Sequence, residues 1–383
     1  MKFVLFYHSL LSDWNHGNAH FLRGVATELI ARGHDVRIYE PADGWSLKNL
    51  LDEQGPAALE QFSEHYPELS SQFYRLDMLD IDRALEDADV VIVHEWNDPK
   101  LIQLIGEKAR RLPCRVLFHD THHRSVTEPL AMKSLDLRYY DGVLAFGRTI
   151  ADRYLKHGWA KLAWVWHEAA DTRRFFPMSS EAKAGDVVWI GNWGDDERTA
   201  ELHEFLIDPI RDLKLKAKIH GVRYPQAALQ ALARANIEYG GWIANYRVPQ
   251  VFGQYRLTVH VPRRAYADTL VGVPTIRMFE ALSCGIPLIS APWNDSERLF
   301  RPGVDYLIAR NGDEMRSAMQ AVLSDPELAR CLAASGLETI RNHHTCKHRV
   351  DELLQILSGL NEAERHSPPL RATVAHAVAR AGA

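Results

Sequence analysis

The stretch TIRMFEALSCGIPLISAP, residues 275–292, predicts a short helix, a stop at Cys284-Gly285 and then a buried strand. Helical spacing of its apolar residues favours the helix, and glycine commonly follows a helix end. One carboxylate, Glu280, stands among these apolar residues. Burying a carboxylate without partners is costly, so we expect either a neighbouring side chain or a ligand to satisfy it.

The same alternation of helical patterns and apolar runs extends through the chain on both sides of this stretch. It predicts α/β architecture with parallel sheets, since parallel strands are covered on both faces and need helical crossovers. After the first run, Phe21, Leu22, Val25 and Leu29 predict a helix that stops at Gly33. The expected strands lie within residues 2–7, 35–40, 89–95, 115–120, 141–147, 161–169, 186–193, 215–221, 237–243, 257–263, 286–292 and 305–311.

A polar stretch, DTRRFFPMSSEAKAGD at residues 171–186, interrupts this pattern. The 383 residues also exceed the ~100–200 residues of an average domain. We therefore expect a first domain at 1–172, a second at 173–360, and a loose tail at 361–383 that is rich in Pro, Ala and Arg.

Charge and cysteine content exclude several classes of protein. The formal net charge is −5 and the 45 basic residues are dispersed, so no nucleic-acid partner is expected. The four cysteines lie far apart in the sequence, which favours a reducing, cytoplasmic location over a disulfide-stapled secreted fold. No apolar run reaches the ~20 residues that span a bilayer, so any membrane contact would be peripheral.

The order and spacing of motifs in residues 237–292, from IEYGGWI through LTVHVPR to FEALSCGIPLISAP, resemble the nucleotide-sugar-binding half of a known enzyme group. The stretch is similar to GT-B glycosyltransferases of the retaining family 4 kind, and most closely to the CgeB-like branch. The resemblance implies two Rossmann-like, doubly wound domains that face a cleft. The second domain would hold the nucleotide-sugar donor and the first the acceptor.

For the donor, the resemblance implies that Glu280 accepts hydrogen bonds from ribose hydroxyls, which suits an acceptor-only carboxylate. The helix start at Thr275-Ile276 offers free amides to a diphosphate. The alternative for Glu280 is a pair with Arg277, about one turn earlier. The sequence also departs from the family pattern at Gly272, where a second glutamate usually stands.

A diphosphate leaving group needs positive charge, which arginine supplies with bidentate geometry. Arg198 and Arg223 are the first candidates, followed by Arg277 and Arg263; pairing with Asp196 or Glu197 is the alternative for Arg198. Three further residues complete the predicted donor site. They are Gly241 and Trp242, expected beside the base, and Asn192, in the loop after the first strand of the second domain.

In the first domain, His16, Gly17 and Asn18 stand where the family has a glycine-rich loop for acceptor or phosphate, although Asn18 could simply cap the helix that follows. His119 and Asp120 are the predicted catalytic residues, because the resemblance places a His-Asp pair near the reacting centre. A metal site in FHDTHHRS, residues 118–125, is not expected, since this stretch is predicted to be a loop at a strand end without a second ligand group.

These features together predict a metal-independent glycosyltransferase of the hexosyltransferase type, without a cofactor. It would move a sugar from a nucleotide diphosphate donor to a sugar, lipid-linked or small-molecule acceptor. Two alternatives stay open at this point. One is a nucleotide-sugar epimerase or hydrolase on the same scaffold, and the other is a catalytically silent sugar-nucleotide-binding protein.

Overall fold

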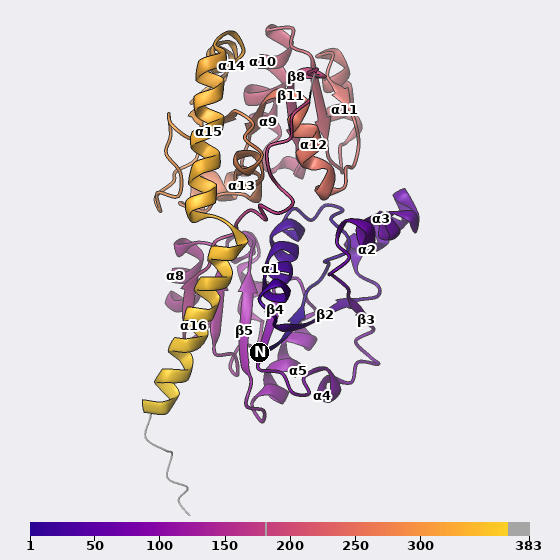
Figure 1. Ribbon diagram of the computed structural model, residues 1–383, viewed down its shortest axis with the longest axis vertical. Coiled ribbons are helices and arrows are strands. Elements are labelled where there is room, and N and C mark those ends of the chain that lie inside the picture. Colours follow the sequence, from indigo (N-terminus) through magenta and orange to yellow (C-terminus); the bar gives the residue numbers. More distant parts are fainter. Residues whose placement is uncertain (181, 367–383) are drawn as a thin grey trace, which may run out of the picture.

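The protein is described by a computed structural model over residues 1–180 and 182–366, in which two α/β domains are stacked along the long axis (Figure 1). Within these residues the first sheet has seven strands in the order β3-β2-β1-β4-β5-β6-β7, and the second has six in the order β10-β9-β8-β11-β12-β13. Each pair of neighbouring strands is parallel. The two doubly wound sheets define the GT-B fold that the sequence predicts.

The strands of the first sheet are β1 (Lys2–Phe6), β2 (Asp35–Pro41), β3 (Gln72–Tyr74), β4 (Val90–His94), β5 (Arg115–Asp120), β6 (Gly142–Ala145) and β7 (Ala163–Val165). Those of the second sheet are β8 (Gly185–Ile190), β9 (Ala217–His220), β10 (Glu238–Tyr239), β11 (Tyr255–His260), β12 (Leu288–Ser290) and β13 (Leu307–Ile308). Each expected strand is confirmed. The sequence does not predict β3, a three-residue edge strand in which Phe73 is exposed and no apolar alternation can develop.

The helices that cover these sheets have the following bounds. They are α1 (Ala19–Ala31), α2 (Trp45–Gln54), α3 (Ala57–His65), α4 (Ile81–Ala84), α5 (Pro99–Ala109), α6 (Arg124–Thr127), α7 (Pro129–Lys133), α8 (Arg148–Lys156), α9 (Thr199–Leu202), α10 (Asp208–Asp212), α11 (Gln226–Arg234), α12 (Val248–Gly253), α13 (Ile276–Ser283), α14 (Gly312–Ser324), α15 (Pro326–His343) and α16 (Cys346–His366). Short 3₁₀ or π turns lie at Asp195–Glu197, His203–Ile207, Asn245–Arg247 and Ala265–Thr269. Within the described residues, no helix combines the length and apolar character needed to cross a bilayer.

Helix α13 and strand β12 confirm the expectation for residues 275–292. The helix ends at Ser283, Gly285 has a φ of +62°, and its N–H donates to the Leu282 carbonyl at 3.1 Å. Helix α1 ends in the same way, since Gly33 has a φ of +79° and donates to Ile30 at 2.9 Å. In both places the left-handed conformation favours glycine and closes the last helical turn.

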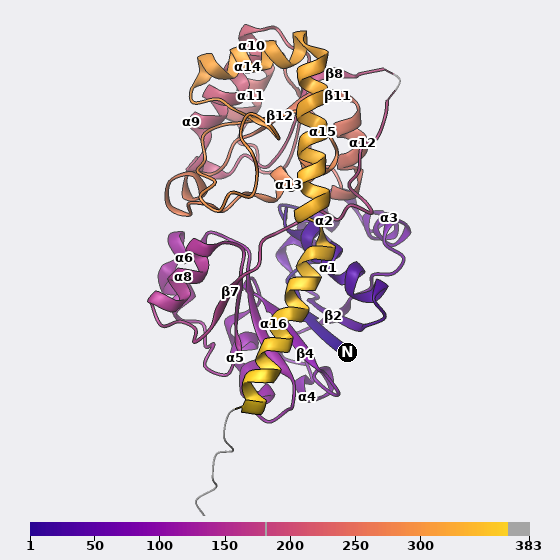
Figure 2. The same cartoon turned by 60° about the vertical axis from the view of Figure 1, so that its left-hand side comes forward.

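The chain crosses between the domains at two adjacent points. The Ala170 N–H donates to the His344 carbonyl at 2.9 Å, and the Cys346 N–H donates to the Ala170 carbonyl at 3.0 Å. Beyond this point α15, on the second domain, gives way to α16, which lies along the first domain against α1 (Figures 1 and 2). Val350 and Leu353 of α16 are fully buried there.

The boundary expected near residue 172 lies in the first of these crossings, and the division into 1–172 and 173–360 stays a prediction. Residues 361–366, which belong to the expected tail, continue α16. The rest of that tail, 367–383, lies outside the described residues.

Candidate functional site

A cavity of about 740 Å³ lies between the two domains. Its lining follows the carboxyl ends of the strands, which is where ligands bind in open parallel sheets. The first-domain wall consists of His8, Asn15, His16, Gly17, Asn18, Pro41, Gly44, Trp45, Ser46, Trp96, His122, His123, Thr127 and Glu128. The second-domain wall consists of Trp189, Ile190, Gly191, Asn192, Glu197, Arg198, Arg223, Val259, His260, Val261, Arg263, Tyr266, Thr275, Ile276 and Arg277.

All four arginines that line the cavity belong to the second-domain wall. Arg223 pairs with Asp195 at 2.9 Å, and Arg263 pairs with Glu197 at 2.7 Å. Both arginines therefore keep donors for a ligand while their charge is partly balanced. The sequence names all four of these arginines as candidates for the diphosphate, and the structure brings them together at one cavity.

Arg198 is held by backbone carbonyls rather than by the carboxylates considered for it. Its Nη1 donates to the Val261 carbonyl at 2.7 Å and its Nε to Trp193 at 3.3 Å, while the guanidinium lies 5.1 Å from the Trp189 ring centroid. No carboxylate of the described residues pairs with it; Glu197 pairs with Arg263 instead. Burial lowers the pKa of Arg198 to about 9, so it stays mainly charged at neutral pH.

The start of α13 opens into the cavity through Thr275, Ile276 and Arg277. Thr275 is extended and makes no capping hydrogen bond, because its hydroxyl lies 3.0 Å from His260 Nε2. The first amides of the helix are therefore not satisfied by a side-chain cap, and together with the helix dipole they favour an anion.

Glu280 lies beneath this helix start and does not line the cavity. Its carboxylate is fully buried, accepts from Asn245 Nδ2 at 2.6 Å and pairs with the Arg277 guanidinium. Burial raises the pKa of Glu280, and Arg277 opposes that rise. The pairing between neighbouring helical turns is thus present in this structure, and the ribose role of Glu280 stays a prediction.

Trp242 and Gly241 also lie away from the cavity lining. The Trp242 Nε1 donates to Asp13 at 3.1 Å across the domain interface, and the Gly241 carbonyl accepts from the Gly221 N–H at 2.9 Å. Asn192 does line the cavity, where its side chain donates to Asn15 of the opposite domain. Base recognition by Gly241 and Trp242 stays a prediction.

The loop His16-Gly17-Asn18 reaches the second domain. A Cβ on Gly17 would lie 3.2 Å from Ile276 Cγ2, so glycine allows this close approach. The alternative role of Asn18 as a side-chain cap is not seen, because Asn18 stands at the N-cap position of α1 but makes no side-chain cap bond. Asn18 has helical backbone angles, and its Nδ2 instead donates to the Thr121 carbonyl at 3.0 Å and hydroxyl at 2.8 Å.

His119 and Asp120 end β5 but lie below the cavity lining, and both are fully buried. The His119 ring stands 4.8 Å from the Trp166 ring and makes no hydrogen bond within the described residues. Burial lowers its pKa to about 3. Asp120 accepts from the Tyr154 hydroxyl at 2.8 Å, and burial raises its pKa. The structure therefore does not place His119 towards a ligand in the cavity, and the catalytic role of the pair stays a prediction.

Some lining residues, His8 and Trp45 among them, are not singled out by the sequence. His8 meets His94, with 3.2 Å between their Nδ1 atoms, and His94 Nε2 lies 2.9 Å from the Thr121 hydroxyl. Trp45 and Trp96 line the first-domain wall, whereas Trp14 and Trp193 are buried. Within residues 1–180 and 182–366 no group of His, Cys, Asp and Glu has a metal-binding arrangement, and metal independence stays a prediction.

Gly272, where the sequence departs from the family pattern, lies in crowded surroundings. Gly272 has a φ of +89°, and a Cβ there would lie 2.5 Å from Ser296 Oγ and 3.0 Å from Glu297 Cγ. The Glu297 carboxylate next to it accepts from Arg148 N–H at 2.8 Å and lies 3.0 Å from His167 Nε2, both in the first domain. A larger residue at 272 would displace this contact between the domains.

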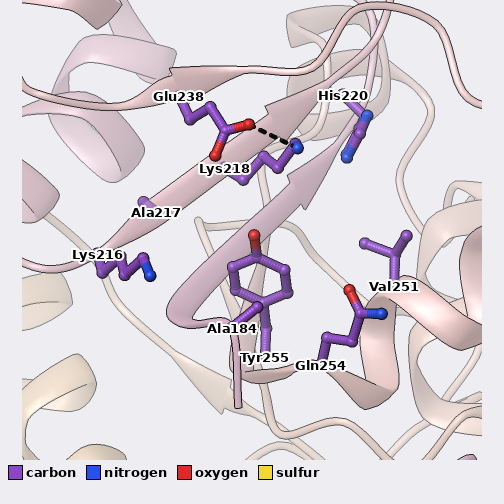
Figure 3. A pocket seen from close by; sticks show the side chains of 9 residues that line it. All are labelled: Ala184, Lys216, Ala217, Lys218, His220, Glu238, Val251, Gln254 and Tyr255. Carbon is purple, nitrogen blue, oxygen red and sulfur yellow. Dashed lines mark ion pairs between the residues drawn. The ribbon is translucent and has the colours of Figure 1, made fainter. Parts of the chain in front are cut away.

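A second pocket of about 300 Å³ lies at the edge of the second sheet, between β9, β10 and the end of α12 (Figure 3). Lys218 and Glu238 pair across it at 2.6 Å. Because no predicted site residue lines this second pocket, the cavity between the domains is the candidate site.

Comparison with known proteins gives one family match over part of the chain. Residues 198–355 match the family described as "Glycosyl transferase-like", which covers the second-domain arginines and α13. No curated protein sequence matches the chain significantly.

Solved structures similar to this chain cover nearly all of it. Sucrose-phosphate synthase from Thermosynechococcus elongatus has 14% identity and a TM-score of 0.64, covering 95% of this chain and 100% of its own. HepE from Anabaena, solved with UDP-glucose, has 15% identity and a TM-score of 0.66, and the match covers 94% of this chain and 100% of HepE. An alpha-glucosyltransferase solved with UDP-glucose and DNA has 13% identity and a TM-score of 0.66, covering 94% and 99%. At these identities the likeness establishes the GT-B fold of this chain.

Proposed function

We propose that the protein is a glycosyltransferase that moves a hexosyl group from a nucleoside diphosphate sugar to an acceptor hydroxyl. The observation that carries this proposal is the second-domain wall, where four arginines and the open start of α13 face one cavity. A nucleoside diphosphate is an anion of matching size and charge, and its negative charge increases as the bond to the sugar breaks. Positive groups placed in advance stabilise that change.

The donor would lie with its diphosphate at Thr275, Ile276 and Arg277, within reach of Arg263 and Arg198. The anomeric carbon–oxygen bond to the diphosphate breaks, a bond to the acceptor oxygen forms, and the acceptor hydroxyl proton passes to the departing nucleoside diphosphate. Arginine can grip phosphate oxygens in a bidentate manner, so we assign charge neutralisation to these side chains rather than to a divalent cation.

The comparisons support the proposal at a coarser level. The family matched by residues 198–355 is glycosyl transferase-like, and HepE and the alpha-glucosyltransferase were both solved with UDP-glucose. The family 4 and CgeB-like assignments rest on the motif order in residues 237–292 and remain part of the proposal.

The proposal is tested by calorimetric titration of UDP, GDP, dTDP and CDP in the presence of EDTA. We expect one of them to bind, and Arg263→Ala to weaken binding by about ten- to hundredfold, as for a charge-assisted hydrogen bond. The matched control is Arg330→Ala, an exposed arginine on α15 that pairs with Glu327 outside the cavity. If no nucleotide binds, or both variants behave alike, the proposal is wrong.

Turnover then separates transfer from its alternatives. The matching nucleotide sugar is incubated with and without acceptor hydroxyl compounds, and its products are followed by mass spectrometry. Transfer gives a glycosylated acceptor, whereas a hydrolase releases free sugar, an epimerase changes the sugar nucleotide, and a silent binding protein leaves it intact.

A further inference from the structure

Two tryptophans are exposed on the first-domain wall of the cavity. Trp45 is 52% exposed and Trp96 is 40% exposed, although both line the cavity. Large apolar side chains are usually buried against other side chains. A large aromatic surface that is exposed and faces a cavity is typical of a ligand contact.

Each tryptophan is held in place by neighbours that leave part of its surface free. The Trp45 ring stands edge to face on the buried Trp14, with 4.9 Å between ring centroids. The Arg124 guanidinium lies 4.5 Å from the Trp96 ring centroid, and the His122 ring meets the same indole at 5.1 Å. Fixed aromatic side chains lose little conformational freedom when a ligand binds.

The two walls of the cavity differ in charge. The four lining arginines belong to the second-domain wall, and no lysine or arginine lines the first. The histidines of the first-domain wall are neutral near pH 7, because burial lowers the pKa of His8 to about 3 and that of His123 to about 4. Glu128 is the one carboxylate on this wall, and it lies 3.3 Å from Arg124.

Resting on the proposed function, we propose that the first-domain wall is an acceptor subsite for an uncharged carbohydrate that stacks on Trp45 and Trp96. A sugar ring presents a face of C–H groups, which packs on an aromatic surface, and a rim of hydroxyls. Polar side chains beside the indoles, among them Asn15 and Thr127, can exchange hydrogen bonds with that rim.

Charge argues against the other acceptor classes. A nucleic acid, a sulfated glycan or a lipid phosphate needs cations along its contact surface. No lysine or arginine lines the first-domain wall, and Arg124 beside it is already paired with Glu128 and stacked on Trp96. A neutral sugar meets no such cost, and its hydroxyl would approach the donor that the opposite arginines hold.

The test measures binding of fluorescently labelled protein, saturated with its nucleoside diphosphate, to immobilised oligosaccharides. The neutral probes are maltotriose, cellotriose, laminaritriose and chitotriose, and the anionic probes are heparin and hyaluronan tetrasaccharides. We expect at least one neutral probe to bind, and Trp96→Ala and Trp45→Ala each to weaken it by about tenfold. Trp96→Phe keeps an aromatic face and should lose no more than about threefold.

Phe176→Ala is the matched control, since this aromatic residue is 43% exposed and does not line the cavity. The inference is overturned if the anionic probes bind better, if no neutral probe binds, or if both tryptophan variants bind like the unmodified protein. Calorimetry on the same samples separates the two proposals: failure to bind any nucleoside diphosphate would contradict the proposed function itself.

Discussion

The His167 imidazole and the Glu297 carboxylate join the two domains, with 3.0 Å between Nε2 and Oε2. The other carboxylate oxygen of Glu297 accepts from the Arg148 N–H at the start of α8. The Glu297 side chain of the second domain thus contacts two segments of the first domain, at Arg148 and at His167. Burial is the largest single influence and would raise the pKa of Glu297, but the contacts with His167 and Arg148 together outweigh it and the pKa is lowered.

Glu297→Ala should lower the free energy of unfolding by ~2 kcal/mol at pH 7, because the buried His167 ring and the Arg148 N–H lose their acceptor. A lowered folded pKa means that this stabilisation is present above the unfolded value of 4.5 and is lost as pH falls through the folded value. Urea denaturation at pH 7 and pH 4 measures both effects. Glu327→Ala, which removes an exposed pair with Arg330, should change little; equal effects of the two substitutions would contradict the role of Glu297.

Glu280→Ala should destabilise the protein by ~3 kcal/mol, since Arg277 and Asn245 would lose their partner in a buried site. The double variant with Arg277→Ala should cost less than the two single changes together, because they remove one shared interaction. Thermal and urea unfolding of all three variants give this coupling. Additive effects would show that the pair does not stabilise the fold.

The predicted ribose contact of Glu280 requires a different readout. If Glu280 also accepts ribose hydroxyls, Glu280→Gln should reduce the preference for a ribonucleoside diphosphate over its 2′-deoxy analogue, from about tenfold towards none. Calorimetric titration of the two nucleotides against both proteins measures this ratio. An unchanged ratio would leave Glu280 as a partner of Arg277 alone.

Gly272→Ala should destabilise the protein by ~3 kcal/mol, through both backbone strain and a clash with Ser296. Gly303→Ala is a matched control, because Gly303 has a φ of +80° but no atom within 4 Å of its added Cβ. Gly303→Ala should lower the free energy of unfolding by only the ~1 kcal/mol that the strained backbone conformation costs. Urea unfolding compares the two variants, and equal losses would argue against the steric account of Gly272.

Asp171 gives a prediction for pH dependence. Burial raises its pKa to about 6 from an ordinary 3.8, and one of its oxygens makes no hydrogen bond within the described residues. Between these values the folded protein holds a proton that the unfolded chain releases, so stability falls as pH rises from 3.8 to about 6 and stays lower above it. Asp171→Asn removes this penalty and should be more stable by ~3 kcal/mol at pH 8. The stability difference between Asp171→Asn and the unmodified protein should vanish below pH 3.8. Thermal unfolding measured at several pH values would contradict the prediction if this difference stayed constant.

Periodicity predicts the elements of this fold because it reports local structure directly. The helix and stop in residues 275–292 follow from apolar spacing and from Gly285, both of which act within a few residues. Periodicity does not predict strand β3, because its pairing with β2 is set by the neighbouring strand rather than by its own pattern.

The candidate site was harder to predict, since it depends on which side chains turn towards the cavity. Loop positions after strands point to Arg198, Asn192 and Gly17, and these three residues line the cavity. The same reasoning cannot distinguish His119, enclosed near Trp166, from His122 three residues later, which lines the cavity. Nor does it mark Trp45, which reaches the wall from the start of α2.

The position of α16 has a consequence for folding during synthesis. Its residues Val350 and Leu353 complete the apolar core beside α1, although more than 300 residues separate the two helices. During synthesis on the ribosome, the whole second sheet is therefore made before α16 can cover the face of the first domain that contains α1. A chaperone or the ribosome surface would have to shield α1 in that interval, and truncation before residue 346 should leave the first domain prone to aggregation.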